Sequence, residues 1–557
     1  MHCVEAVVGP LIVLFHGFPE FWDAWRHQFS SILQNAGKVE SMNALLNLVP
    51  KLCRRHLLRV SVLVVFLCGP FAADEFPSAT WKTASPESQG LDSAVLAEAL
   101  DYVRTKSVPL HSFLIVRNGV VVLDAYFYPY IGREPHDIAS ATKSVTSAAT
   151  GIAIEQGYIK SVDQTVMPLL PHAPGDSDPR RRNVSVRHLL TMTSGFDCDT
   201  EGGEKALPAM RHSPDWAAFA LAIPMRADPG SLYAYCSCNN HLLSSIITAT
   251  TGKSLLEFTQ KNLFGPLGIT DVVWPADPKG RTHGWGDLHL YPHDMARLRL
   301  LYLNRGRWGN VQIEPANWVS ESSKASVTVR EGVGYGYSWW INTARPPIFE
   351  AGGRGGQRIA ILPKENMVVV FTGGGANTDE IAPFLFKAIR SDAAIADNPA
   401  GQQRLAQALA RVAEPVSEMA NAKTPRLART VSGTTYSLSP NPLDLRTLQF
   451  EFNDQSSAEV TLQFDSATWT APVGLDGKRR FAPVGPHSLS VATVGRWISA
   501  DEFLLDLDTV ANVNHFLFSV HFDENKIRIR MNETTGEIKD VIVDGTAELA
   551  PRKKLER

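Results

Sequence analysis

Two pairs of strand-like segments, far apart in the chain, restrict its fold more than any other feature. Residues 112–127 carry two apolar, β-branched runs around Asn118-Gly119, the dipeptide that most strongly indicates a two-residue hairpin turn. Residues 358–372 repeat the pattern, with a polar turn between two apolar runs. The sequence between the two pairs has mainly helical periodicity. This order predicts an α+β fold, in which a helical region is inserted into an antiparallel sheet.

The C-terminal third of the chain has a different character. Residues 391–428 are rich in alanine and include a stretch of helical spacing, which predicts a connecting helix and linker. Apolar and polar side chains then alternate in short segments such as Leu448–Phe452 and Ile527–Met531. Such alternation is typical of half-exposed antiparallel strands. We therefore expect an α+β domain at residues 75–390 and an all-β accessory domain, a small barrel or sandwich, at residues 429–557.

Length and composition limit the classes of protein to consider. At 557 residues the chain exceeds one ordinary domain, and its 44% hydrophobic and 20% charged content is that of a folded globular protein. A formal net charge of -3, without a basic run interleaved with aromatic residues, predicts no nucleic-acid binding. The 6 cysteines have no zinc-binding spacing, and Cys236 and Cys238 are too close for an easy mutual bridge. We expect buried thiols without a disulfide framework, and no metal site.

The N-terminal segment carries two signals of another kind. Residues 1–41 include Leu11–Glu20, an apolar run that ends in His-Gly-Phe-Pro-Glu and resembles the start of an α/β-hydrolase of the epoxide hydrolase type. The chain lacks the Gly-x-Ser-x-Gly elbow of that fold, so we interpret the segment as a fragment and not as an independent domain. Residues 42–74 combine a basic stretch with the apolar run 60–73, the layout of a signal peptide or membrane anchor. They predict export to the periplasm or the outside, with residues 57–73 holding the chain to a membrane if they are not cleaved.

Ser140 and Lys143 are the first candidates for chemistry. They open a segment whose apolar residues recur at helical spacing, so they lie one turn apart on the same face of a helix start. A serine hydroxyl is a poor nucleophile until a neighbouring base takes its proton, and a lysine can act as that base when burial lowers its pKa. The helix N-terminus also favours a developing negative charge. Alone, the spacing is weak evidence, because a helix cap beside a solvated lysine has the same pattern.

Two further motifs follow in an order that strengthens the case. Arg187-His-Leu-Leu-Thr-Met-Thr-Ser-Gly195 resembles the signature that follows the nucleophile in class C β-lactamases and penicillin-binding proteins, a family that includes esterases and 6-aminohexanoate-dimer hydrolases. Pro229-Gly then leads to Tyr235-Cys-Ser237, where these relatives have Tyr-x-Asn before a helix. The resemblance spans roughly residues 85–385. It implies a β-lactamase/transpeptidase-like fold, with an antiparallel sheet and a helical domain.

The resemblance also implies roles for individual residues. It assigns Ser140 as the nucleophile, Lys143 as its proton partner and Tyr235 as a general base or acid. Ser237 stands where the family has asparagine, and we expect it to contact the substrate. This replacement is the first departure from the family pattern.

The second departure is at the strand that lines the site, where the family usually has Lys-Thr-Gly or His-x-Gly. The corresponding run, Glu350-Ala-Gly-Gly-Arg-Gly-Gly-Gln357, contains no lysine. Glycines let the backbone approach a substrate closely, so we expect Gly355, Gly356 and Gln357 to help form an oxyanion hole. A tight turn or β-bulge without a catalytic part is the alternative.

These features predict acyl transfer to serine at an ester or amide bond, without a metal or organic cofactor, on a small-molecule or peptide substrate. Esters or linear amides come first, then peptides with D-amino acids, then β-lactams, which lose their carboxylate contact unless Arg354 or Arg358 replaces the missing lysine. Two alternatives stay open: a penicillin-binding-like protein that binds a ligand without turnover, and an epoxide hydrolase, which rests on His16-Gly17 alone. The sequence His283-Gly284 is interpreted as a loop and not as a catalytic motif, because it lies far from the terminal strand.

Overall fold

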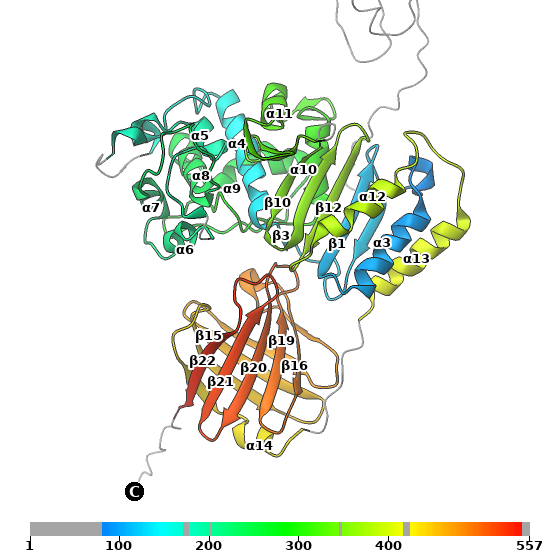
Figure 1. Ribbon diagram of the computed structural model, residues 1–557, viewed down its shortest axis with the longest axis vertical. Coiled ribbons are helices and arrows are strands. Elements are labelled where there is room, and N and C mark those ends of the chain that lie inside the picture. Colours follow the sequence, from blue (N-terminus) through cyan, green and yellow to red (C-terminus); the bar gives the residue numbers. More distant parts are fainter. Residues whose placement is uncertain (1–80, 171–177, 201–202, 345–347, 416–423, 549–557) are drawn as a thin grey trace, which may run out of the picture. The chain divides into compact units, whose positions relative to one another are not determined.

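An eight-stranded antiparallel sheet forms the centre of the α+β domain (Figure 1). The strand order is β2-β1-β12-β11-β10-β9-β8-β7, so the N-terminal hairpin pairs directly with the late strands. The strands are β1 (Leu110–Arg117), β2 (Val120–Tyr126), β7 (Val327–Arg330), β8 (Val333–Tyr335), β9 (Trp340–Asn342), β10 (Ile348–Gly353), β11 (Gln357–Leu362) and β12 (Met367–Gly373). The expected fold class is therefore confirmed. Strands from both ends of the domain form one sheet, and the helical region is inserted between them in the sequence.

Both predicted hairpins are present. In the first, Asn118 and Gly119 have φ values of 51° and 79°, and the left-handed region at both central positions is what a type I′ turn requires. The second consists of β11 and β12, which pair antiparallel with Leu362 opposite Met367. Local turn chemistry and strand propensity therefore suffice to locate these four strands.

Helices cover both faces of the sheet (Figure 1). Successive residues of β1 enter different cores, Leu114 on one side and Phe113 on the other, because side chains alternate along a strand. Helices α4, α8 and α10 pack in the first core, and α3, α12 and α13 in the second. The helices are α3 (Ser93–Thr105), α4 (Thr142–Glu155), α5 (Val186–Leu190), α6 (Ala206–Arg211), α7 (Trp216–Ala222), α8 (Ser237–Thr251), α9 (Leu255–Thr259), α10 (Pro292–Leu303), α11 (Ala316–Ser322), α12 (Ala382–Ala388), α13 (Pro399–Ala413) and α14 (Leu427–Val431). The helix expected after residue 391 is α13, whose Leu405 and Ala408 pack in the core of this domain.

The C-terminal strands form an all-β barrel. Ten strands follow the order β16-β15-β14-β13-β22-β21-β20-β19-β18-β17, and a β16–β18 pairing closes the sheet. Large apolar side chains such as Phe450 and Phe503 fill the interior. The strands are β13 (Thr435–Leu438), β14 (Leu445–Phe452), β15 (Ser457–Phe464), β16 (Thr468–Gly474), β17 (Arg480–Ala482), β18 (Val491–Trp497), β19 (Glu502–Asp508), β20 (His515–Asp523), β21 (Lys526–Glu533) and β22 (Val541–Ala547). The barrel and the α+β domain belong to one compact unit of the chain.

The structure, a computed structural model, describes residues 81–170, 178–200, 203–344, 348–415 and 424–548. The expected α/β-hydrolase fragment and the expected signal peptide or membrane anchor lie outside the described residues. Within the described part of the chain, no helix has the length and apolar character needed to cross a membrane.

Candidate active site

Ser140 lies in the short 3₁₀ turn Ala139–Ala141, which runs directly into α4. Ala139 has a φ of 45°, in the left-handed region that residues other than glycine rarely adopt. Its N–H donates to Asp137 Oδ1 at 2.8 Å, and its carbonyl accepts from the Thr142 hydroxyl at 2.6 Å. These bonds hold the turn in a conformation that local propensity disfavours. They leave the serine partly exposed just before the helix, whereas the sequence places it in the first helical turn.

The Lys143 side chain is buried below Ser140. The residue is only 1% exposed, and its Nζ lies 2.7 Å from Ser140 Oγ and 2.9 Å from the carbonyl oxygen of Trp285. A buried amine needs polar partners, and here a hydroxyl and a backbone carbonyl supply them. The structure thus brings the two side chains together, as their spacing predicts.

Trp285 belongs to a loop, residues 283–287, whose part in the site sequence reasoning missed. The Thr146 hydroxyl on α4 donates to the Gly284 carbonyl at 2.7 Å. A Cβ on Gly284 would lie 2.1 Å from the carbonyl oxygen of Asn240, so the loop fits closely against α8 as well. The glycines on either side of Trp285 are the only sequence signal for this close approach. They do not reveal that the Trp285 carbonyl accepts a hydrogen bond from Lys143 Nζ.

The face of the Tyr235 ring lies next to the Lys143 amine. Lys143 Nζ lies 5.0 Å from the ring centroid, within the range of a cation–π contact. The ring is stacked on Trp340, with centroids 5.9 Å apart and planes 16° apart, and meets Tyr335 edge-on at 6.3 Å. Aromatic packing therefore sets the plane of the ring. The Tyr235 ring therefore lies beside Lys143 with its face toward the amine, and the acid–base role of its hydroxyl stays a prediction.

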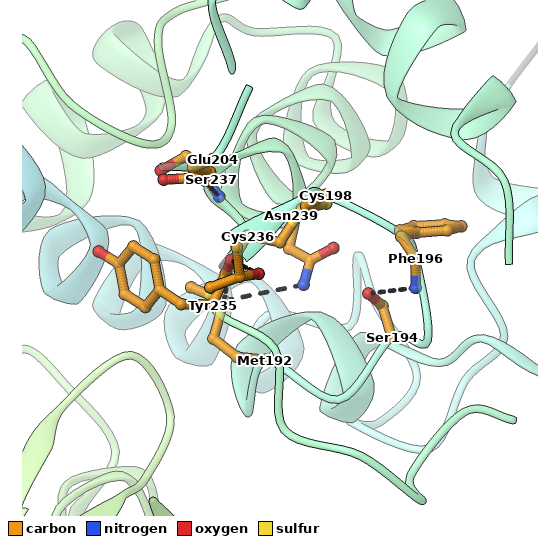
Figure 2. Close-up of a disulfide and its surroundings, with 10 residues drawn as sticks. Met192, Ser194, Phe196, Cys198, Glu204, Tyr235, Cys236, Ser237 and Asn239 are labelled. Carbon is orange, nitrogen blue, oxygen red and sulfur yellow. Dashed lines mark hydrogen bonds between the residues drawn. A yellow bond between two sulfur atoms is a disulfide. The ribbon is translucent and has the colours of Figure 1, made fainter. Parts of the chain in front are cut away.

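A disulfide joins Cys198 to Cys236, the residue between Tyr235 and Ser237 (Figure 2). The expectation of cysteines without a disulfide is therefore wrong for this pair. The two residues are 38 positions apart in sequence, yet their Cα atoms lie 5.7 Å apart, a separation that a disulfide can bridge. Tertiary folding brings them together, so their spacing gives no sign of the bond. Cys238 is a free thiol, and its burial raises its pKa to about 12.

The motif Arg187–Gly195 supports the segment that leads into α8. The Thr193 carbonyl accepts the Gly230 N–H at 2.8 Å, and the Met192 carbonyl accepts the Ala234 N–H at 2.9 Å. These two contacts are backbone hydrogen bonds, and Met192 Sδ adds a side-chain contact to the Cys236 N–H at 3.4 Å. The part of the motif is to place the following segment beside the nucleophile.

Ser237 is the first residue of α8 and is only 1% exposed. Its backbone N–H donates to the carboxylate of Glu204 (Figure 2). A carboxylate at this end of a helix is stabilised by the unpaired N–H groups and the helix dipole. The position is thus next to Tyr235 but covered, and the expected contact of Ser237 with substrate stays a prediction.

The glycine-rich run forms the turn between β10 and β11. Gly355 and Gly356 have φ values of 81° and 90°, which explains why these positions need glycine. A Cβ on Gly353 would lie 2.5 Å from the Ile138 carbonyl oxygen, so the turn presses directly against the segment that carries the serine. The Gln357 side chain is buried, and its Nε2 donates to the Gly373 carbonyl at 2.5 Å. The Gln357 side chain is thus bound within the sheet, and the expected part of Gly355, Gly356 and Gln357 in an oxyanion hole stays a prediction.

Comparison with known sequences identifies the family. A sequence model described as Beta-lactamase matches residues 97–394, more than half of the chain. The chain belongs to the beta-lactamase family. It is therefore a serine hydrolase of the acyl-enzyme type, and the resemblance that its motifs indicate is confirmed.

Several known proteins are similar to the chain over most of their own length. "Putative D-alanyl-D-alanine carboxypeptidase" from Salmonella typhimurium is 24% identical over 399 residues, which cover 57% of this chain and 91% of that protein. A solved structure, "Putative 6-aminohexanoate-dimer hydrolase from Bacillus anthracis", is 21% identical with a TM-score of 0.46, and covers 61% of this chain and 88% of its own. The penicillin binding protein from Bacillus halodurans is 19% identical with a TM-score of 0.43, and covers 52% and 99% respectively.

The charged side chains near the glycine-rich turn are engaged elsewhere. Arg354 donates to Thr535 Oγ1 and Asn514 Oδ1 in the barrel, both at 2.7 Å. Arg358 forms ion pairs with Glu350 at 3.2 Å and with Asp379 at 2.6 Å. Burial alone would lower the pKa of Arg358, but these two carboxylates raise it. Neither arginine stands as an unpaired cation in place of the family lysine. Among the described residues, no group of three or more His, Cys, Asp or Glu side chains is arranged to hold a metal ion.

We predict that Gly353→Ala slows ester hydrolysis strongly, whereas Gly352→Ala leaves it close to wild type. A Cβ at 353 meets the Ile138 carbonyl at 2.5 Å and pushes on the serine turn, whereas a Cβ at 352 makes only an ordinary contact of 3.4 Å with Trp340. A misplacement of about 1 Å costs on the order of 10²-fold in rate. Steady-state hydrolysis of p-nitrophenyl butyrate measures the difference, with circular dichroism as the check on folding. Equal rates for the two folded variants would contradict the contact.

Proposed function

We propose that this chain hydrolyses ester or linear amide bonds through an acyl-enzyme formed on Ser140. The observation that carries the proposal is the 2.7 Å separation between Ser140 Oγ and Lys143 Nζ, with the amine buried and the hydroxyl partly exposed. A serine within reach of a base is the arrangement that nucleophilic catalysis needs. The family match supports the same chemistry.

In the acylation step, the Ser140 hydroxyl gives its proton to Lys143 Nζ while Oγ bonds to the substrate carbonyl carbon. The carbonyl oxygen becomes an oxyanion, which backbone N–H groups of Ser140 and of the turn ending at Gln357 stabilise. Tyr235 then donates a proton to the leaving alcohol or amine as its bond to carbon breaks, and the proton on Lys143 restores the phenol. In deacylation, water gives a proton to the same groups and attacks the acyl ester. The proton returns to Oγ as the carboxylic acid leaves.

The charge distribution of the turn favours esters and linear amides over β-lactams. The family lysine that holds a substrate carboxylate is absent from Glu350–Gln357, and Arg354 and Arg358 are bound to other side chains. An anionic substrate would find no fixed cation in this turn. Substrates with uncharged acyl groups need no such cation, so its absence does not weaken their binding.

A second substrate class is supported by the name of a relative. The Salmonella protein is described as "Putative D-alanyl-D-alanine carboxypeptidase", a description that favours amide bonds between D-amino acids. A carboxypeptidase must hold the terminal carboxylate of its peptide, and the turn offers no unpaired arginine for this purpose. We therefore place this class second. A binding protein without turnover is disfavoured, because it would not need a buried amine in hydrogen-bond contact with Ser140.

We also propose that the chain is exported to the periplasm or the extracellular space. The Cys198–Cys236 disulfide supports this location, since disulfides form and persist mainly in oxidising compartments. The sequence signal for export lies outside the described residues, so the disulfide is an independent argument.

Ser140→Ala is expected to abolish covalent labelling by a fluorophosphonate probe. Ser144→Ala is the matched control: this serine lies one turn further along α4 but is fully buried and donates to the Ser338 carbonyl at 2.7 Å. The probe reacts only with an activated, accessible serine. Labelled protein is followed by in-gel fluorescence and by mass spectrometry of the modified peptide. Undiminished labelling of Ser140→Ala would refute the assignment.

Tyr235→Phe is expected to lower kcat by roughly 10²-fold or more, the usual contribution of a general acid or base. The substitution keeps the ring over Lys143 and its stacking on Trp340, so only the hydroxyl is lost. Tyr233→Phe is the control, since it removes a neighbouring hydroxyl that is buried and makes no hydrogen bond. Equal kcat values for the two variants on p-nitrophenyl butyrate would mean that the Tyr235 hydroxyl transfers no proton.

The wild-type enzyme is expected to favour p-nitrophenyl butyrate over nitrocefin by at least about 10-fold in kcat/KM. A hydrogen bond to a charged group contributes about 1.5–3 kcal/mol, and the β-lactam carboxylate lacks that partner here. Both substrates are measured on the same preparation, and Ser140→Ala gives the background rate. Faster turnover of nitrocefin would reverse the ranking of substrates.

A further inference from the structure

We propose that the Cys198–Cys236 disulfide is a positioning element of the active site, which holds Tyr235 over Lys143. This inference rests on the proposed function, in which Tyr235 transfers a proton. It goes further by assigning a catalytic consequence to a disulfide that touches no substrate. The disulfide acts together with two hydrogen bonds that arise from the same part of the chain.

Proton transfer by Tyr235 requires that its side chain keep a fixed position. Its ring must stay 5.0 Å from Lys143 Nζ while the hydroxyl exchanges a proton with the leaving group. Trp340 and Tyr335 fix the plane of the ring, but they do not fix the backbone from which it projects. That backbone lies immediately before α8, where a helix end has unpaired N–H groups and tends to fray. Without further support, Tyr235 would move together with this end.

Three consecutive residues at this helix end, Tyr235 to Ser237, are each bound to a residue between Cys198 and Glu204; Figure 2 shows the partners Cys198 and Glu204. The carbonyl of Tyr235 accepts a hydrogen bond from Thr200 Oγ1 at 2.9 Å. The next residue, Cys236, is bound covalently to Cys198. The N–H of the residue after it donates to the Glu204 carboxylate. The ties therefore restrain the backbone that directly follows the Tyr235 Cα.

The disulfide is the strongest of the three ties. Cys198 is 1% exposed and Cys236 is fully buried, so their sulfurs are shielded from solvent reductants. The two hydrogen bonds can exchange with water when the helix end opens, whereas the covalent bond cannot. Met192 also meets this segment, but its Sδ accepts the Cys236 N–H only as a weak acceptor at 3.4 Å. Loss of the disulfide would leave only hydrogen bonds to hold the segment.

The third cysteine of the region, Cys238, is a poor partner for exchange with the Cys198–Cys236 disulfide. Cys238 lies two residues from Cys236, but its burial raises its pKa to about 12. Thiol–disulfide exchange requires a thiolate, and this thiol has almost none at neutral pH. Cys238 is therefore a spectator, which makes it the natural control for cysteine chemistry in this region.

The experiment compares Cys198→Ala/Cys236→Ala with Cys238→Ala in the full chain, each in the wild-type and in the Tyr235→Phe background. We expect the double variant to lose roughly 10–10²-fold in kcat on p-nitrophenyl butyrate with little change in KM, because placement of Tyr235 is affected and not binding. In the Tyr235→Phe background most of this loss should disappear, since residues that act through one another are not additive. Cys238→Ala should keep the wild-type kcat.

Three outcomes would overturn the proposal: wild-type kcat in the double variant, an equal loss in both backgrounds, or an equal loss in Cys238→Ala. An equal loss in both backgrounds would indicate general structural support. If the double variant does not fold, Cys198→Ser/Cys236→Ser decides, because it removes the disulfide and keeps the size of both side chains. It should lower kcat in the wild-type background only, and wild-type kcat in this folded variant overturns the proposal. Failure of the underlying function is separate, since it appears as wild-type kcat in Tyr235→Phe with the disulfide intact.

Discussion

The hydrogen bonds of one buried amine determine how the active site is assembled. Lys143 Nζ lies inside the protein, where an unsatisfied polar group costs about 2–7 kcal/mol. One partner, Ser140 Oγ, is on the same turn, but the other, the Trp285 carbonyl, is 142 residues further along the chain. The Tyr235 ring covers the amine from a third direction. The amine can therefore be buried without penalty only when α4, the 283–287 loop and the start of α8 are all in place.

Sequence reasoning predicted the features that depend on neighbours in the chain. The Asn118-Gly119 turn, the alternation in β14 and β21, and the common face of Ser140 and Lys143 follow from local geometry and period. The Trp285 carbonyl and the Cys198–Cys236 bond escaped prediction. In both cases the partner is fixed by packing of distant segments, and no motif or spacing encodes that packing.

The arginines near the glycine-rich turn show the same limit in another form. Charge and position suggested Arg354 and Arg358 as replacements for the family lysine. The sequence carries no information on the direction of a long side chain, and in the structure both point to partners other than a substrate: Asn514 and Thr535 for the first, Glu350 and Asp379 for the second. The absence of a fixed cation at this turn is thus a product of tertiary contacts as much as of composition.

The contact between the glycine-rich turn and the barrel has a consequence for the order of events during synthesis. Arg354 depends on Asn514 and Thr535, which leave the ribosome 160 and 181 residues later, and a Cβ on Gly355 would lie 2.3 Å from Val513. Domains generally fold in the order in which they are translated. The α+β domain can therefore collapse early, but its glycine-rich turn gains these contacts only after the barrel has formed. A chain that ends before the barrel lacks the partners of Arg354 and the packing of Val513 against this turn.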